Sequence, residues 1–200
     1  MKKILTLIFT LVCLTAFAEQ KENTETIDYM KQLSAVKSLY AEFKQVNNLK
    51  DYGEDIYTGK VYIKMKEKAL WDYIEPYSSW YLITNENIDH YDEINNQLVK
   101  MKAKDYKEYA LLQVLMDFSQ LSKSFSSEQK ENTLYLKPKS DTGLAYINII
   151  FKDNVISEIK SKDNAGNLTT ITLNNVEIDK KISNSSFKKK LPSDVNVFNQ

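Results

Sequence analysis

The stretch Gly59–Pro76, GKVYIKMKEKALWDYIEP, constrains the fold of this chain more than any other part of the sequence. Apolar and polar residues alternate along Tyr57–Met65, and after a short charged turn Trp71 and Tyr73 again lie on one side. A period of two is typical of a strand that buries one face. Pro76 ends the pattern because proline has no N–H to donate to a neighbouring strand. The stretch therefore predicts an antiparallel hairpin with one apolar, aromatic face.

The N-terminus has the features of an export signal. Two lysines precede the apolar run Ile4–Leu14, which is too short to span a bilayer as a stable helix. An Ala-Phe-Ala sequence then offers the small residues that signal peptidase requires, so we expect cleavage after Ala18 and a single mature domain at 19–200. The single cysteine, Cys13, lies inside this signal, and we expect neither a disulfide nor thiol chemistry in the mature chain.

Charge and motifs argue against several classes of function. The chain has 27 basic and 27 acidic residues, whereas a general nucleic-acid binder is usually distinctly basic. The sole histidine, His90, has no cysteine or second histidine with which to bind a transition metal, and we expect no metal and no cofactor. No nucleophile-elbow, P-loop or zinc motif is present, so we expect no enzyme activity. No long apolar run follows Ala18, and we expect no stable membrane insertion.

Two segments have a helical pattern. The first begins at Thr26, with apolar residues at spacings of three and four. Periodicity alone does not decide whether it continues through Phe43 or changes to a strand before that residue. The second begins at Asp105 with the spacing of a capping box and runs to Phe118. The serine-rich segment Ser119–Ser127 that follows is expected to be a loop.

Strand signals dominate the rest of the chain. Beyond the hairpin, strands are expected at Trp80–Thr84, Ile88–Asp92, Leu98–Lys102, Thr133–Lys137, Ala145–Lys152, Val155–Ser161 and Leu168–Val176. The turns between them contain asparagine and glycine, which tolerate positive φ. We therefore predict an α+β fold, with a strongly curved antiparallel sheet of about nine strands or more and helices against one face.

Several motifs, in their order along the chain, resemble the outer-membrane lipoprotein carrier protein family, LolA. They are Ser38–Gln45, Gly59–Pro76, Leu82–Asn85 with Ile88–Asp92, Asp163–Ile171 and Phe187–Val197. The resemblance covers nearly the whole mature chain and implies an unclosed β-barrel with a helical lid over an apolar cavity. It also implies a non-enzymatic periplasmic chaperone for acylated lipoproteins. Such a chaperone takes its cargo from an inner-membrane lipoprotein-releasing ABC transporter and delivers it to an outer-membrane lipoprotein acceptor.

The resemblance also implies roles for particular residues. A helix residue that supports lipid transfer falls on Leu33, and an aromatic residue that handles the lipid falls on Trp71. The lipid-binding candidates on the early strand and hairpin are Phe43, Val61, Ile63, Trp71 and Tyr73. The family's lid-gating arginine is replaced here by Met65-Lys66, and Lys66 could donate to a backbone carbonyl without the planar fork of arginine. For each apolar candidate taken singly, ordinary core packing is the alternative interpretation. The implied start of the early strand is near Ser38.

Two hypotheses from other functional classes remain beside the carrier. One is a periplasmic module that senses a lipid or peptide on the same half-barrel. The other is an envelope hydrolase, for which the sequence offers no serine or carboxylate constellation. The run 188–190, three lysines, is expected to be solvated, with docking to a membrane or partner as the alternative.

Overall fold

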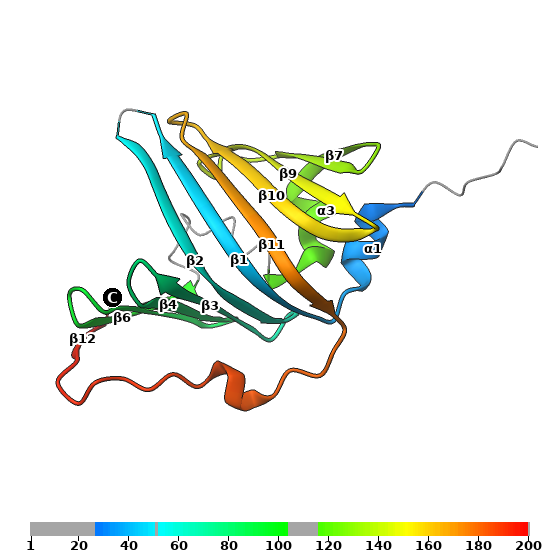
Figure 1. Cartoon of the computed structure of the whole chain (residues 1–200). Helices are drawn as coiled ribbons and strands as arrows, with labels where there is room; N and C mark the ends of the chain where they lie inside the picture. Colours follow the sequence, from blue (N-terminus) through cyan, green and yellow to red (C-terminus); the bar gives the residue numbers. More distant parts are fainter. Residues whose placement is uncertain (1–26, 51, 104–115, 200) are drawn as a thin grey trace, which may run out of the picture.

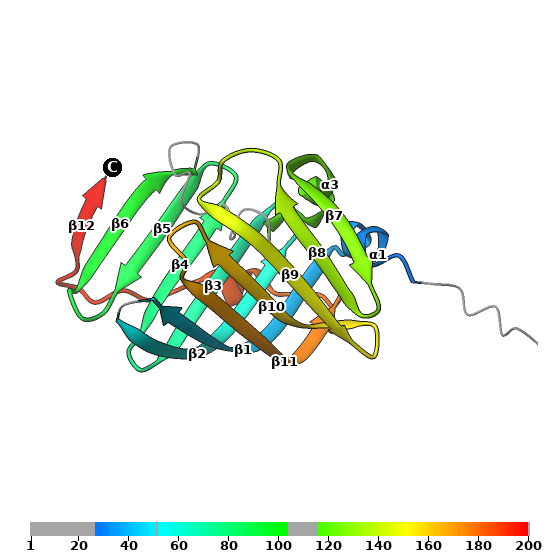
Figure 2. The ribbon, with the colours of Figure 1, turned by 90° about the horizontal axis from the view of Figure 1, so that it is seen from above.

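The computed structural model describes residues 27–50, 52–103 and 116–199, and these form one open sheet (Figure 1). Its 12 strands follow the order β12-β6-β5-β4-β3-β2-β1-β11-β10-β9-β8-β7. All neighbours pair antiparallel except β12, which runs parallel to β6. Figure 2 shows β12 at one end of the sheet, and β7 with the helices α1 (Tyr29–Ala35) and α3 (Leu121–Ser124) at the other.

The strands have the following bounds: β1 Ser38–Leu49, β2 Gly53–Lys64, β3 Lys68–Glu75, β4 Ser79–Thr84, β5 Asn87–Asp92, β6 Gln97–Lys102, β7 Phe125–Lys130, β8 Thr133–Pro138, β9 Leu144–Lys152, β10 Val155–Asp163, β11 Leu168–Ile178 and β12 Asn196–Asn199. Two 3-10 helices, η3 (Phe118–Gln120) and η4 (Asn184–Phe187), complete the regular structure of the described residues. Each strand that the sequence predicts is present, with its ends shifted by a few residues.

The helix-to-strand boundary near Ser38 is now defined. Asp28 caps α1 by accepting a hydrogen bond from the N–H of Lys31, and Val36, which follows the helix, is already extended. β1 then begins at Ser38 and pairs with β2 over its whole length. The first helix is therefore short, and the alternative of one long helix through Phe43 is wrong.

One expectation from the sequence is wrong. The segment Ser119–Ser127 is not a loop, because it contributes η3, α3 and the first half of β7. β7 is an edge strand that buries only Phe125, so its sequence is mostly polar and lacks a clear alternation. The predicted sheet of nine or more strands is confirmed, and the described residues are mostly β with two short α-helices. Most of the helical pattern that starts at Asp105 lies outside the described residues.

Different elements of the chain cover the two faces of the sheet. α1, η3 and α3 pack on what we call the inner face, where the larger buried cluster lies. That cluster draws members from both ends of the sheet, including Met101 of β6 and Leu136 of β8.

No helix among the described residues has the length and apolar character needed to cross a membrane.

A C-terminal strap, residues 179–195, crosses the outer face between β11 and β12 (orange to red in Figure 1). It begins where the N–H of Asp179 donates to the carbonyl oxygen of Ser38 at 2.9 Å. Phe187, in η4, then packs into a smaller buried cluster on the outer face with Leu70, Trp80, Tyr91 and Leu98. The strap therefore lets β3–β6 bury apolar residues on both faces of the sheet.

Candidate functional site

The candidate lipid-binding residues lie together on the inner face. Phe43 comes from β1, Val61 and Ile63 from β2, and Trp71 from β3. All four are at most 3 % exposed and belong to the same cluster as Leu33 of α1. Tyr73 is partly buried and packs against that cluster. The structure thus brings all six candidates onto one continuous apolar surface, which the strand alternation alone could not establish.

Aromatic rings connect these residues in a series. The ring of Phe43 lies 5.2 Å from that of Trp71 and 5.2 Å from that of Tyr73, centroid to centroid. Trp71 is 2 % exposed, and its indole Nε1 has no acceptor among the described residues. A buried indole N–H normally finds a partner, because its desolvation is costly. Trp71 therefore offers a hydrogen-bond donor inside an otherwise apolar region.

α1 covers one end of the inner face through few contacts. The ring of Tyr29 stacks on Phe151 of β9 at 3.9 Å with an interplanar angle of 4°. The side chain of Gln129 accepts from the N–H of Tyr29 at 3.0 Å and donates to the carbonyl oxygen of Ile27 at 2.6 Å. The side chain of Gln32 donates to the carbonyl oxygen of Asn154. Side-chain amides thus hold this seven-residue helix to the β7 edge and the β9–β10 turn.

Lys66 lies at the tip of the β2–β3 hairpin and contacts the chain that leads into η3. Its backbone N–H donates to the carbonyl oxygen of Met116 at 3.0 Å, and its own carbonyl oxygen accepts from the side chain of Asn85 at 2.9 Å. Asp117 follows and caps η3. Burial acts to raise the pKa of Asp117, but hydrogen bonds from Ser119 and Gln120 outweigh it, so that the pKa is lowered. Both of these contacts are therefore made by the backbone of Lys66.

A pocket of about 270 Å³ continues the inner face beyond Tyr73. We call it the tyrosine pocket, and it is lined by Gln45, Asn47, Tyr57, Tyr73, Tyr77, Ser79, Tyr81, His90 and Asp92. The ring of Tyr57 meets those of Tyr73 and Tyr77 edge to face, at 5.7 and 6.4 Å. The ring of Tyr81 stacks on His90 at 4.0 Å. The hydroxyl of Tyr73 donates to the side-chain oxygen of Gln45 at 3.0 Å.

The tyrosine pocket is poorly solvated at its aromatic wall. Burial, together with a hydrogen bond to Tyr77, raises the pKa of Tyr57 to about 12. Burial also raises the pKa of Tyr73 and lowers that of His90, although Asp92 opposes the shift at the histidine. A lowered pKa leaves His90 neutral at pH 7. This pocket was not predicted from the sequence, although the alternation that places Tyr57 and Tyr73 on the same face of their strands is a signal for it.

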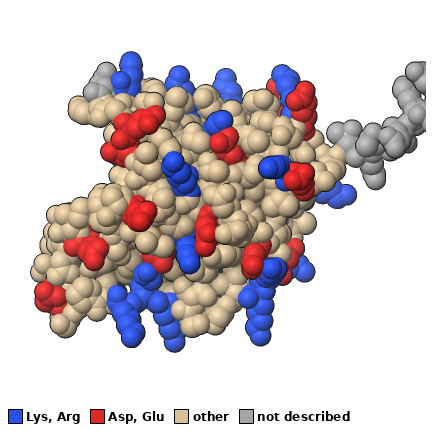
Figure 3. Space-filling model, viewed as in Figure 1, with Lys and Arg blue, Asp and Glu red and all other residues tan. Residues whose placement is uncertain are grey.

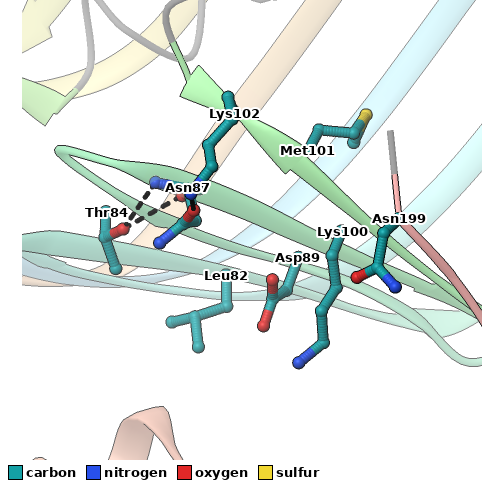
Figure 4. A pocket seen from close by; sticks show the side chains of 8 residues that line it. All are labelled: Leu82, Thr84, Asn87, Asp89, Lys100, Met101, Lys102 and Asn199. Carbon is teal, nitrogen blue, oxygen red and sulfur yellow. Dashed lines mark hydrogen bonds between the residues drawn. The ribbon is translucent and has the colours of Figure 1, made fainter.

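Two further pockets lie on the outer face. One, of about 400 Å³, has a mixed polar and apolar lining and spans β4, β5, β6 and Asn199 of β12. Figure 4 shows Asp89 and Lys100 on the same side of the sheet as Leu82, with Met101 pointing the opposite way. Among the described residues no group of three or more potential metal ligands occurs.

The other outer pocket lies beside the strap and contains the three consecutive lysines. Trp80 and Tyr91 line it together with residues 188–192. The run is not simply solvated, because Nζ of Lys189 lies 2.6 Å from Oδ1 of Asp72 in β3. Figure 3 shows lysines at the lower edge of the molecule, where the strap runs in Figure 1, and both signs of charge interspersed above them.

The chain is similar to known proteins over most of its length. The family model described as outer membrane lipoprotein carrier protein LolA matches residues 34–190. An outer-membrane lipoprotein carrier protein of Helicobacter hepaticus is 27% identical and aligns with 90% of this chain and 87% of its own. The protein of the same name from Francisella tularensis subsp. tularensis is 26% identical, with 100% and 98% covered.

Solved structures agree on the fold. An uncharacterized conserved protein from Thermus thermophilus superposes with a TM-score of 0.55 at 12% identity, over 86% of this chain and 97% of its own. A LolA superfamily protein from Nitrosomonas europaea superposes with a TM-score of 0.51 at 10% identity, over 80% and 96%. At such identities the likeness concerns the fold alone.

Proposed function

The chain belongs to the LolA family of outer membrane lipoprotein carrier proteins, and on that basis we propose that its inner face binds the acyl chains of lipoproteins. The family is periplasmic, and its carriers are non-enzymatic chaperones that take part in lipoprotein localization. The observation that supports the proposed site best is the single buried surface formed by Leu33, Phe43, Val61, Ile63 and Trp71, with Tyr73 at its margin.

Burial of an acyl chain on this surface supplies the affinity. Each CH₂ group removed from water contributes about 0.8 kcal/mol, so ten methylenes contribute about 8 kcal/mol before the cost of ordering the chain. The ester carbonyl of an acyl chain is a hydrogen-bond acceptor, and the buried N–H of Trp71 is a donor without an acceptor among the described residues. We assign this N–H to a carbonyl of the bound lipid.

Access to the surface requires movement of the elements that cover it. We infer that the sheet acts as a half-barrel and that α1 with η3 and α3 forms its lid. The chain that leads into η3 is held at the hairpin tip by the contact between Lys66 and Met116. A lid that closes over an apolar surface keeps it from water when no cargo is bound, and a modest opening cost allows cargo to leave. Lys66 is the proposed gating residue.

Membership of the LolA family also suggests where the protein acts and with which partners it exchanges cargo. We propose that the mature domain is 19–200, released into the periplasm by cleavage after Ala18. Cargo would come from an inner-membrane lipoprotein-releasing ABC transporter and pass to an outer-membrane acceptor. The alternative, a periplasmic lipid- or peptide-sensing module on the same fold, predicts binding without delivery.

A release experiment tests this proposal. Membrane vesicles that contain a triacylated lipoprotein and the releasing transporter are incubated with the mature chain, and soluble 1:1 complexes are measured by size exclusion. We expect release with the parent protein and with Ala35→Lys, because Ala35 is exposed on α1. Leu33→Lys should reduce release at least tenfold, since Leu33 is 2 % exposed on the same helix. Failure of the parent to form any complex would disprove carriage, and equal release by both variants would disprove the role of Leu33.

A further inference from the structure

The tyrosine pocket has a chemistry that the acyl chains do not use. Four of its nine lining residues are tyrosines, and the others are polar. Tyr57 lies at the centre, because its ring meets both Tyr73 and Tyr77 edge to face. Aromatic rings therefore line much of one small volume, and the faces of aromatic rings carry partial negative charge.

Asp92 is the only lining residue with a formal charge at neutral pH, since burial keeps His90 neutral. Its carboxylate is held in place by the turn that follows β5. Oδ1 accepts from the N–H of Ile94 at 2.9 Å, and Oδ2 accepts from the side chain of Asn95 at 2.6 Å. Each carboxylate oxygen can accept a further hydrogen bond. The pocket therefore combines aromatic faces with one fixed negative charge and has no lysine among its lining residues.

We propose that the tyrosine pocket binds a primary ammonium group carried by the head of the lipid cargo. An ammonium ion near a tyrosine ring is attracted by the ring quadrupole, and more strongly where water is excluded. Asp92 accepts a charge-assisted hydrogen bond from the same group. This assignment rests on the proposed function in one respect: the acyl chains must lie on the inner face.

The position of the pocket fits that placement. Inner-face residues along β3 run from Ala69 through Trp71 to Tyr73, and the pocket begins at the last of these. The hairpin tip at Lys66, which contacts Met116, lies at the opposite end of the same strand pair. Acyl chains beside Trp71 would therefore leave the head of the molecule near Tyr73 and Tyr57. Three sources share the ammonium chemistry: a free α-amine on the lipid-bearing residue, a lysine side chain, and an aminophospholipid head group.

Three amphiphiles of one chain length test the assignment. Binding of dodecylammonium, dodecanol and dodecanoate is measured by intrinsic fluorescence and calorimetry. We expect dodecylammonium to bind at least tenfold more tightly than dodecanol, and dodecanoate more weakly than either. Equal binding of all three would overturn the ammonium site while leaving the acyl surface intact. Binding of none would overturn the acyl surface, and with it the inference.

Variants locate the preference in the pocket. Asp92→Asn should reduce the preference for dodecylammonium over dodecanol to about threefold or less, whereas Asp89→Asn should leave this preference unchanged. Asp89 lies on the outer face of the same strand, so this control removes the same charge. Tyr57→Phe should keep the preference and Tyr57→Leu should lose most of it, because phenylalanine retains the π face. An unchanged ratio in both Asp92→Asn and Tyr57→Leu would refute the site.

Lipopeptides identify the source of the ammonium group. A diacylated peptide with a free α-amine is compared with its N-acetylated form and with an N-acetylated form that carries one lysine near the lipid. Tighter binding of the first assigns the α-amine, and tighter binding of the third assigns lysine. If the pocket prefers dodecylammonium but does not distinguish the three peptides, the aminophospholipid head group is the source. Loss of any ammonium preference in the amphiphile series remains the result that overturns the inference.

Discussion

Substitution of Gly59 by alanine should destabilise the central hairpin through a steric clash. Gly59 of β2 pairs with Phe43 of β1, and a β-bulge separates it from Thr58 on the β3 side. A Cβ at this position would overlap the carbonyl oxygen of Asp72 and lie 2.8 Å from Cζ of Phe43. Both the β3 backbone and a ring of the proposed binding surface would therefore have to move.

The expected cost can be assembled from three contributions. Overpacking in a tight interior costs about 1–3 kcal/mol, and a weakened backbone hydrogen bond costs about 1 kcal/mol. The lower backbone entropy of alanine in the unfolded chain offsets about 0.4–1 kcal/mol. We expect the free energy of unfolding to fall by about 2 kcal/mol. Gly143→Ala is the matched control: Gly143 has a φ of +75° and no atom within 4 Å of an added Cβ, so only backbone strain of about 1 kcal/mol applies.

Urea unfolding followed by tryptophan fluorescence measures both variants. With a slope of about 2 kcal/mol/M, the midpoint of Gly59→Ala should fall by about 1 M and that of Gly143→Ala by about half as much. Because Phe43 is displaced, Gly59→Ala should also bind dodecanol more weakly in native buffer. A midpoint for Gly59→Ala at or above that of Gly143→Ala would refute the steric argument.

Three further predictions concern the strap and the tyrosine pocket. Phe187→Ala should lower the free energy of unfolding by about 3 kcal/mol and expose the strap to trypsin, because the ring is buried in the outer cluster; unchanged proteolysis would contradict its role as an anchor. A double-mutant cycle of Asp72→Asn with Lys189→Met should give a coupling of about 1 kcal/mol, since the 2.6 Å pair is partly buried, and additive effects would count against it. Tyr57 has its pKa raised from 10.0 to about 12, so its contribution to stability is complete below pH 10 and is lost as pH rises to about 12. Between pH 9 and pH 12 the free energy of unfolding of Tyr57→Phe should therefore fall less than that of the parent. Equal falls in the two proteins would disprove the raised pKa of Tyr57.

Strand alternation predicted the inner face of β2 because only that face of the strand has fully buried residues, and it placed Trp71 of β3 on the same face. Val61, Ile63 and Trp71 all lie on the inner face, as the period of two requires. The pattern failed at both sheet edges. β7 and β12 have few buried residues, so selection for an apolar face is weak there and no alternation is visible in the sequence.

The tyrosine pocket and the strap depend on contacts between distant segments. Tyr57, Tyr73, Tyr81 and His90 come from four successive strands, and their meeting depends on register and a β-bulge that periodicity does not encode. Lys189 looks like part of a solvated lysine run until its partner, 117 residues earlier, is known. Local patterns thus predict which face a side chain occupies but not which side chains it meets there.

On the proposed function, the change from apolar to polar residues along the inner face would limit how tightly the protein holds its cargo. On β1 the inner-face residues change between Phe43 and Gln45, and on β3 they change between Trp71 and Tyr73. These two positions lie on either side of Gly59 in β2, and the ring of Phe43 contacts both residues of β3. Apolar burial beyond this line would add about 25 cal/mol for each Å² and deepen the bound state without aiding release. On the proposed function, a boundary at Phe43 would fix how far the acyl chains enter, and would leave recognition of the head group to interactions that a competing acceptor could replace.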